Sequence, residues 1–190
     1  ADSMYNRKEY DDAYQLYEKF ALDNPAHPRA AEELYRSGMS LYHLRYYTQA
    51  IDAWRKLLAA HPNSPDTEKA TFQIADTLFR AQKYDESSAM YQGILSKYPK
   101  SDQLPLAYLR VTMSAFNAKD DAGTLNGALA LMAKFPAAAE AVDALDLMEA
   151  VYDRSPGADF EASLSKIMAA VPGTKTAGDA QFRIGRRYFE

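Results

Sequence analysis

The stretch Leu57–Ala70, LLAAHPNSPDTEKA, ends one apolar helical pattern at His61-Pro62 and begins another within a few residues. The stretch 94–107, ILSKYPKSDQLPLA, repeats this arrangement 37 positions later. Proline lacks the amide hydrogen that a continuing helix needs and disfavours the α conformation in the residue before it, so each proline is a helix stop. Stops at a regular interval indicate an internal repeat.

Two markers fix the period of this repeat. Helix-stopping prolines stand at intervals of 37, 37, 37 and 36 residues, at Pro25, Pro62, Pro99, Pro136 and Pro172. An aromatic residue stands 20 positions before each of them, at Tyr5, Tyr42, Phe79, Phe116 and Tyr152, and the next in register is Phe189. The shortened interval therefore lies between Pro136 and Tyr152. Because the aromatic series is uniform, we expect it to be mainly structural.

Each period contains two amphipathic helices, and the second period shows them best. Residues 29–44 and 47–60 each carry one apolar stripe, and a tight break at Arg45-Tyr46 separates them. A pair this short cannot bury both stripes, so neighbouring pairs must stack. The sequence predicts an all-α, right-handed α-solenoid of stacked antiparallel helix pairs. Its turns are expected near residues 45, 63, 82, 100, 119, 136, 155 and 173.

At these positions the chain resembles the tetratricopeptide repeat (TPR) family. That family places a small residue and an aromatic in its first helix, then Tyr, a small residue, an aromatic, an aliphatic and Pro. The matching residues are Gly38, Tyr42, Tyr47, Ala50, Trp54, Leu57 and Pro62, then Ala75, Phe79, Tyr84, Ser87, Tyr91, Ile94 and Pro99, with Tyr5, Tyr10, Ala13, Tyr17, Phe20 and Pro25 in a first, partial repeat. The match weakens after residue 99, where Thr112, Asp121, Thr124, Ala128, Met148, Phe160 and Leu164 depart from the pattern.

The period of 37, with its extra residues after the proline, resembles bacterial envelope proteins such as the outer-membrane assembly lipoprotein BamD and the cell-division coordinator CpoB. This resemblance implies a bacterial source, a periplasmic or envelope-associated location and a role in outer-membrane assembly. A cytoplasmic location is the alternative.

Repeat boundaries follow from the prolines. Residues 1–190 are expected to form one TPR-like solenoid cut from a longer protein. The complete repeats are 26–62, 63–99, 100–136 and 137–172, and the partial ones are 1–25 and 173–190. The last partial repeat is expected to expose Phe182, Ile184, Tyr188 and Phe189, which would allow end-to-end self-association between copies.

Residues that carry chemistry are few. A net charge of −4 argues against nucleic acid as a main partner, and no run approaches the ~18 apolar residues of a membrane span. His27, His43 and His61 have no metal-ligand spacing, and no phosphate loop or nucleophile motif accompanies the acidic residues. We expect no catalytic residue, metal or cofactor. Lys175, Arg183, Arg186 and Arg187 form either a solvated helix face or a site for an acidic partner.

The family resemblance implies a concave groove lined by the first helix of each pair. Its groove-facing positions are Tyr35, Met39, His43, Phe72, Asp76, Arg80, Leu109, Met113 and Asn117. Aromatics, Met and Arg are enriched where proteins bind proteins, although packing between repeats uses the same types. The leading hypothesis is a non-catalytic scaffold that binds a peptide or protein partner. The alternative is an accessory domain of a larger enzyme whose catalytic part lies outside this chain.

Overall fold

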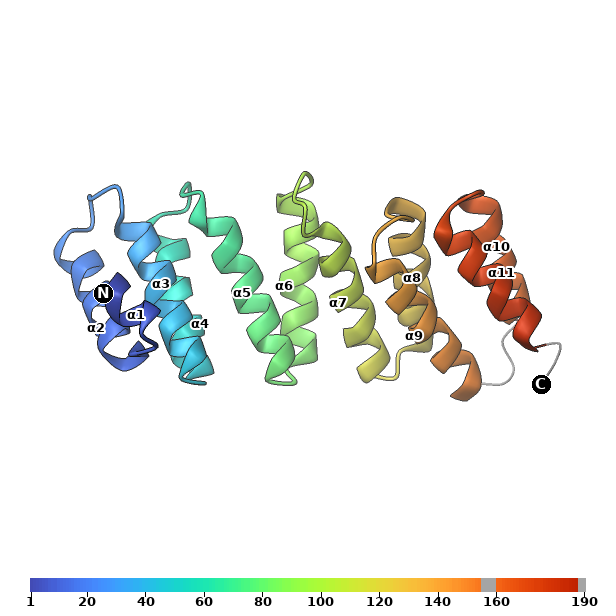
Figure 1. Cartoon of the computed structure of the whole chain (residues 1–190), viewed down its shortest axis with the longest axis horizontal. Coiled ribbons are helices and arrows are strands. Elements are labelled where there is room, and N and C mark those ends of the chain that lie inside the picture. Colours follow the sequence, from blue (N-terminus) through green and yellow to red (C-terminus); the bar gives the residue numbers. More distant parts are fainter. Residues whose placement is uncertain (155–159, 188–190) are drawn as a thin grey trace. The chain divides into compact units, whose positions relative to one another are not determined.

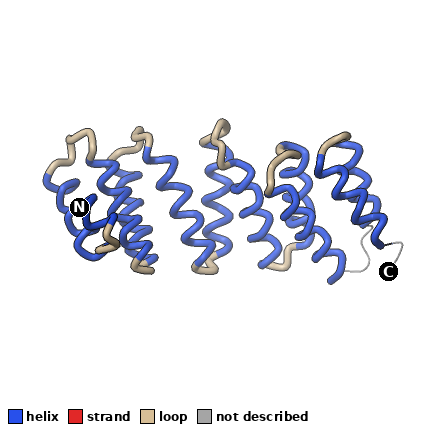
Figure 2. Tube along the Cα trace, viewed as in Figure 1, coloured by secondary structure: helices blue, strands red, loops and turns tan. Residues whose placement is uncertain are grey.

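The computed structural model describes residues 1–154 and 160–187, which form α-helices joined by short turns (Figure 1; Figure 2). The predicted turn near residue 155, the side chains of Phe160 and Arg187, and Tyr188 and Phe189 lie outside the described residues. The described chain divides into two units, residues 1–90 and 91–190, and the division falls within one helix.

Unit 1 begins with a short helix and continues as alternating first and second helices of a pair. Its helices are α1 (Asp2–Asn6), α2 (Tyr10–Asp23), α3 (Ala30–His43), α4 (Tyr47–Ala60), α5 (Asp66–Arg80) and the start of α6 (Tyr84–Lys97). Unit 2 holds the rest of α6, then α7 (Leu104–Asn117), α8 (Asp121–Lys134), α9 (Glu140–Arg154), α10 (Phe160–Ala170) and α11 (Lys175–Arg187). Odd-numbered helices are first helices and even-numbered ones are second helices.

Seven of the eight predicted turn centres fall in the described residues, and each lies between two helices. The two helices expected at 29–44 and 47–60 are α3 and α4, with ends within one residue of the prediction. The all-α fold of TPR-like helix pairs is confirmed. A single array running through both units stays a prediction.

The core of unit 1 is organised around one tryptophan. Trp54 of α4 is fully buried, and its ring lies against Gly38 of α3 so closely that a Cβ on Gly38 would stand 2.3 Å from the indole Nε1. That Nε1 donates a hydrogen bond of 3.1 Å to the carbonyl oxygen of Tyr35. The absence of a side chain at residue 38 therefore admits the ring and lets it reach the backbone of α3. The same core cluster contains Leu34, Leu41, Ala50, Ile51, Leu57, Ile74 and Leu78.

In unit 1 the small residue stands on the first helix of the pair and the large one on the second. The core of unit 2 has the opposite arrangement. In register with Gly38 stands Thr112 of α7, and in register with Trp54 stands Ala128 of α8. Gly127 faces the Thr112 side chain, because a Cβ on Gly127 would lie 2.5 Å from the Thr112 hydroxyl oxygen. A larger residue on the first helix is thus matched by smaller ones on the second. This exchange explains two departures from the family pattern, Thr112 and Ala128, as one packing solution. The main core residues are Leu131, Met132, Leu145, Met148, Tyr152, Leu164 and Ile167.

The tight turns between first and second helices share one backbone conformation. Lys8, Arg45, Gln82 and Lys119, spaced by 37 residues, all have positive φ between 61° and 65°. Each follows a helix end in the Schellman pattern: at Arg45 the amide donates to Tyr42 O, and the next amide, of Tyr46, donates to Leu41 O. Glycine is the usual residue here, and none of these four positions carries it.

Gln82→Gly is expected to stabilise the protein by up to ~1 kcal/mol, because the left-handed conformation strains a residue that has a Cβ. Chemical denaturation of the variant and the parent measures this. Gln92→Gly, at an exposed position inside α6, is the matched control and should cost ~1 kcal/mol. Equal losses in both variants would show that the turn at residue 82 is unstrained.

Candidate interaction surface

The predicted groove positions differ in how far they are exposed. In unit 1, Tyr35, Met39 and Asp76 are half-buried, whereas His43 and Arg80 are exposed. Met113 is half-buried and Asn117 exposed in unit 2. Phe72 and Leu109 are only 4% and 5% exposed. Both side chains are buried between the packed helices. Neither residue therefore offers accessible surface to a partner.

Tyr35 and Met39 lie at the edge of the unit 1 core. Both pack against its buried residues while keeping part of their surface accessible. The Lys69 ammonium stands 6.0 Å from the centre of the Tyr35 ring. Burial raises the pKa of the Tyr35 phenol, and a hydrogen bond with Gln73 opposes this. The Tyr35 hydroxyl therefore stays protonated and can form hydrogen bonds at neutral pH.

His43 belongs to an aromatic cluster that joins neighbouring repeats. Its ring stacks on Tyr10 at a centroid distance of 4.7 Å, and its Nε2 is 3.1 Å from the hydroxyl of Tyr5. Arg80 occupies the corresponding place one repeat later, where it forms an ion pair of 2.7 Å with Asp76 and interacts electrostatically with Tyr42. His43 thus contacts Tyr5 at the end of the preceding first helix, whereas Arg80 is linked to the preceding first helix only by its electrostatic interaction with Tyr42.

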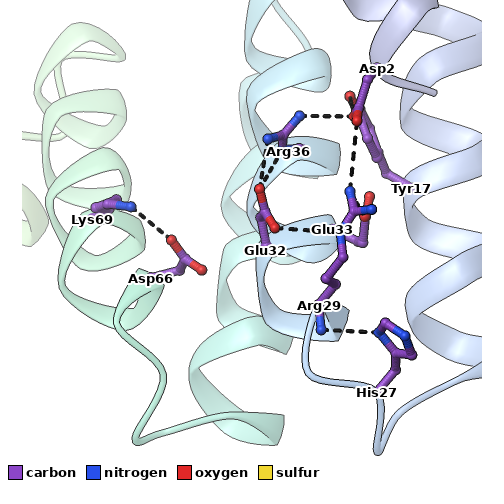
Figure 3. Close-up of polar contacts among 9 residues, drawn as sticks. All are labelled: Asp2, Tyr17, His27, Arg29, Glu32, Glu33, Arg36, Asp66 and Lys69. Atoms are coloured by element: carbon purple, nitrogen blue, oxygen red, sulfur yellow. Dashed lines mark hydrogen bonds and ion pairs between the residues drawn. The ribbon is translucent and has the colours of Figure 1, made fainter.

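A network of charges, which the sequence analysis did not predict, crosses α1 and α3 (Figure 3). Arg36 bonds Asp2 at 2.8 Å and Glu32 at 2.6 Å. Arg29 bonds Glu33 at 2.6 Å, and the Glu33 side chain is only 7% exposed. Burial raises the pKa of Glu33, while Arg29 lowers it. The ion pairs Arg29–Glu33 and Glu32–Arg36 could have been predicted, because residues four apart on a helix lie side by side. The Asp2–Arg36 pair joins residues far apart in the sequence, so no sequence pattern indicated it.

Tyr17 is a second buried member of the network, beside Glu33. Its side chain is fully buried, and its hydroxyl donates a hydrogen bond of 2.8 Å to Asp2. Burial, with the bond to Asp2, raises the pKa of Tyr17 to about 12. The same hydrogen bond, together with Arg36 and Arg29, lowers the pKa of Asp2.

This arrangement predicts a loss of stability at alkaline pH. From pH 10 to about pH 12 the unfolded chain gives up the Tyr17 proton while the folded chain keeps it, so stability falls as pH rises across this window. Tyr17→Phe keeps the ring but has no proton to lose, and its unfolding free energy should fall less steeply with pH. Urea titrations of both proteins across the window measure the two slopes; identical slopes would contradict the assignment.

In unit 2, two arginines of α11 pair with acidic side chains of α9. Arg183 bonds Asp146 and Glu149, and Arg186 also bonds Glu149. The basic residues of α11 are therefore partly neutralised by α9, which favours the solvated-face interpretation for Arg183 and Arg186. On α7, the Asn117 amide donates to the Met113 carbonyl oxygen at 2.8 Å, so this pair is held within its own helix.

Residues 1–154 and 160–187 contain neither a cluster of metal-ligating side chains nor a helix suited to spanning a membrane. No group of three acidic or histidine side chains in this part of the chain is placed to hold a metal ion. No helix there combines the length and apolar character that spanning a membrane requires.

A comparison with models of protein families shows which family the chain belongs to. The family model described as "YfiO: Outer membrane lipoprotein" matches residues 29–185. This chain belongs to the YfiO family. The match covers both units and includes the repeats that depart from the common TPR pattern. It confirms the predicted relationship to TPR-containing envelope lipoproteins of the BamD kind. A search of curated proteins found no match to this chain.

Solved structures resemble the YfiO chain in fold. MamA from Desulfovibrio magneticus RS-1 has a TM-score of 0.65 at 15% identity, with 89% of each chain covered. YrrB, described as a TPR protein with an unusual peptide-binding site, has a TM-score of 0.61 at 17% identity, covering 95% of this chain and 87% of that one. At such identities these likenesses show the fold alone, which is that of TPR proteins.

Proposed function

We propose that the protein is a non-catalytic scaffold that binds a peptide or protein partner in the bacterial envelope. The proposed binding residues in unit 1, here called the first-helix surface, are Tyr35, Met39, His43, Asp76 and Arg80. Met113 and Asn117 are the corresponding residues in unit 2. The family description as an outer membrane lipoprotein supports the envelope location.

The observation that carries this proposal is the composition of α3 along one face. Tyr35, Met39 and His43 follow one another at four-residue intervals, and each keeps accessible surface although α3 is otherwise largely buried. Aromatic and Met side chains bury much area on binding at a low entropic cost, and a nearby Arg adds directed hydrogen bonds. Asp76 and Arg80 supply charge on the next first helix. The aromatic and Met side chains would therefore supply apolar contact area, and the charged side chains would discriminate between partners.

Site-specific photo-crosslinking in the source bacterium tests the proposal. A crosslinking amino acid at Met39 or His43 should capture a discrete protein partner, whereas the same group at Arg55, exposed on the second helix α4, should not. Met39→Ala and Arg80→Ala should each weaken capture by about tenfold or more while leaving the protein folded, as judged by circular dichroism, since truncating an interface anchor costs ~2 kcal/mol. Capture from Arg55 alone would place binding on the second helices and refute the first-helix surface.

A further inference from the structure

One position of the first helices, repeated once in every period, brings its side chain to an arginine. The residues at this position are Asp2, Met39, Asp76, Met113 and Glu149. All three acids among them are paired with arginines, in the ion pairs Asp2–Arg36, Asp76–Arg80, Glu149–Arg183 and Glu149–Arg186. The position therefore lies within reach of a guanidinium group, and it accommodates side chains that carry oxygen.

Met113 occupies this position on α7 and also meets an arginine. The Arg110 Nη1 atom donates a hydrogen bond of 3.6 Å to the Met113 sulfur. Met113 is half-buried, so part of its side chain is accessible to small solutes. Met39, the equivalent residue on α3, is half-buried too, but its sulfur has no hydrogen-bond donor among the residues that the structure describes. Because a thioether sulfur is only a weak acceptor, an oxygen bound to the Met113 sulfur would satisfy Arg110 better.

We propose that Met113 is a site of oxidation to methionine sulfoxide by hydrogen peroxide, and that Arg110 promotes this reaction. The sulfur lone pair attacks one peroxide oxygen, so that the S–O bond forms while the O–O bond breaks. The other oxygen leaves as hydroxide and takes the proton of the transferred oxygen, which gives water and the sulfoxide. The thioether loses two electrons and the peroxide gains them. Cells can reverse this modification enzymatically.

Arg110 favours both the reaction and its product. Negative charge develops on the departing peroxide oxygen, and a guanidinium group beside the sulfur stabilises that charge. In the product, the sulfoxide oxygen accepts a stronger hydrogen bond from Arg110 than the sulfur does. This oxygen would stand beside an arginine, as the carboxylate oxygens do at the same position of other repeats. Met113 also belongs to the proposed binding surface of unit 2, but its oxidation requires no partner.

Treatment of the whole chain with hydrogen peroxide, followed by peptide mass spectrometry, measures the oxidation rate of each methionine. Met113 should be oxidised at least about threefold faster than Met39, a smaller gain than an enclosed oxyanion-hole donor gives, because Met113 is half-exposed. Met132 and Met148 are buried, so they should be oxidised slowest, and faster oxidation of these two would report unfolding.

Arg110→Gln should slow the oxidation of Met113 to the rate of Met39 and leave the Met39 rate unchanged. The matched control is Arg80→Gln, which removes an arginine that bonds Asp76 and should not alter the Met113 rate. Equal rates at Met113 and Met39 in the parent would overturn the proposal. So would an Arg110→Gln variant that oxidises Met113 as fast as the parent while its buried methionines stay slow.

Met113→Gln tests the product without relying on any change at Arg110. Glutamine resembles methionine sulfoxide in length and carries an acceptor oxygen, so this variant should keep the circular dichroism spectrum and the melting temperature close to those of the parent. Met148→Gln, which places the same group in the buried core, should lower the melting temperature strongly. An equally large loss in Met113→Gln would show that the repeat does not accommodate the sulfoxide and would contradict the site.

Discussion

Trp54→Ala is expected to destabilise the protein by ~3–5 kcal/mol, the usual cost of removing a large buried aromatic side chain. Trp54 is fully buried, and its indole also donates the hydrogen bond to the Tyr35 carbonyl oxygen. Gly38 cannot fill the space, because it has no side chain. Chemical denaturation measures the loss. Tyr46→Ala, at an aromatic that is 49% exposed in the neighbouring turn, is the control and should change stability far less.

The location of this loss is a sharper test than its size. In a repeat array each helix pair is stabilised mainly by its neighbours, so damage spreads from the altered pair outward. Hydrogen exchange in Trp54→Ala should accelerate first in α3 and α4. Uniform acceleration over both units would contradict this and indicate all-or-none cooperativity.

Met148→Ala is expected to cost ~2–5 kcal/mol, although it restores the small residue that the TPR pattern favours at this position. Met148 is fully buried in the unit 2 core together with Leu145 and Leu164. Removing its side chain would leave a cavity, because the neighbouring side chains are packed around methionine. Thermal or urea unfolding measures this loss of unfolding free energy.

The matched variant at the same register position is Gly38→Ala. It should also be destabilising, but through overlap with Trp54, since overpacking a filled core typically costs ~1–3 kcal/mol. Stabilisation by Met148→Ala would show that the family pattern outweighs local packing in unit 2.

Periodic features of the fold were predictable from sequence because they depend on local stereochemistry. The prolines and the apolar stripes located the turns, and α3 and α4 were placed within one residue. The opposite placement of small and large residues in the facing pairs Gly38–Trp54 and Thr112–Gly127 was not predicted. It depends on which side chains face each other across a helix pair, and local sequence does not show this. The positive φ at Arg45 and Gln82 was also missed, since no glycine stands at either position.

The candidate surface was only partly predictable for a related reason. Helical register placed Tyr35, Met39 and His43 on one face of α3, and each has accessible surface. Register alone could not distinguish an accessible position from a buried one, so Phe72 and Leu109 were included although neighbouring helices cover them. In the aromatic series, Tyr152 is buried but Tyr5, Tyr42, Phe79 and Phe116 are half-buried. Their structural role stays a prediction.

The contacts that join successive helix pairs have a mechanical consequence. Arg154–Asp121, Tyr5–His43 and Thr176–Pro136 span 33, 38 and 40 residues, which is close to one repeat. A protein held by such contacts can be unravelled from one end without first breaking a tie between distant parts of the chain. Each repeat pulled away would lengthen a tethered molecule by roughly 120–130 Å of extended chain, at ~3.3–3.6 Å per residue. Under load, each such unit would therefore yield one helix pair at a time, because each pair is held mainly by its neighbours.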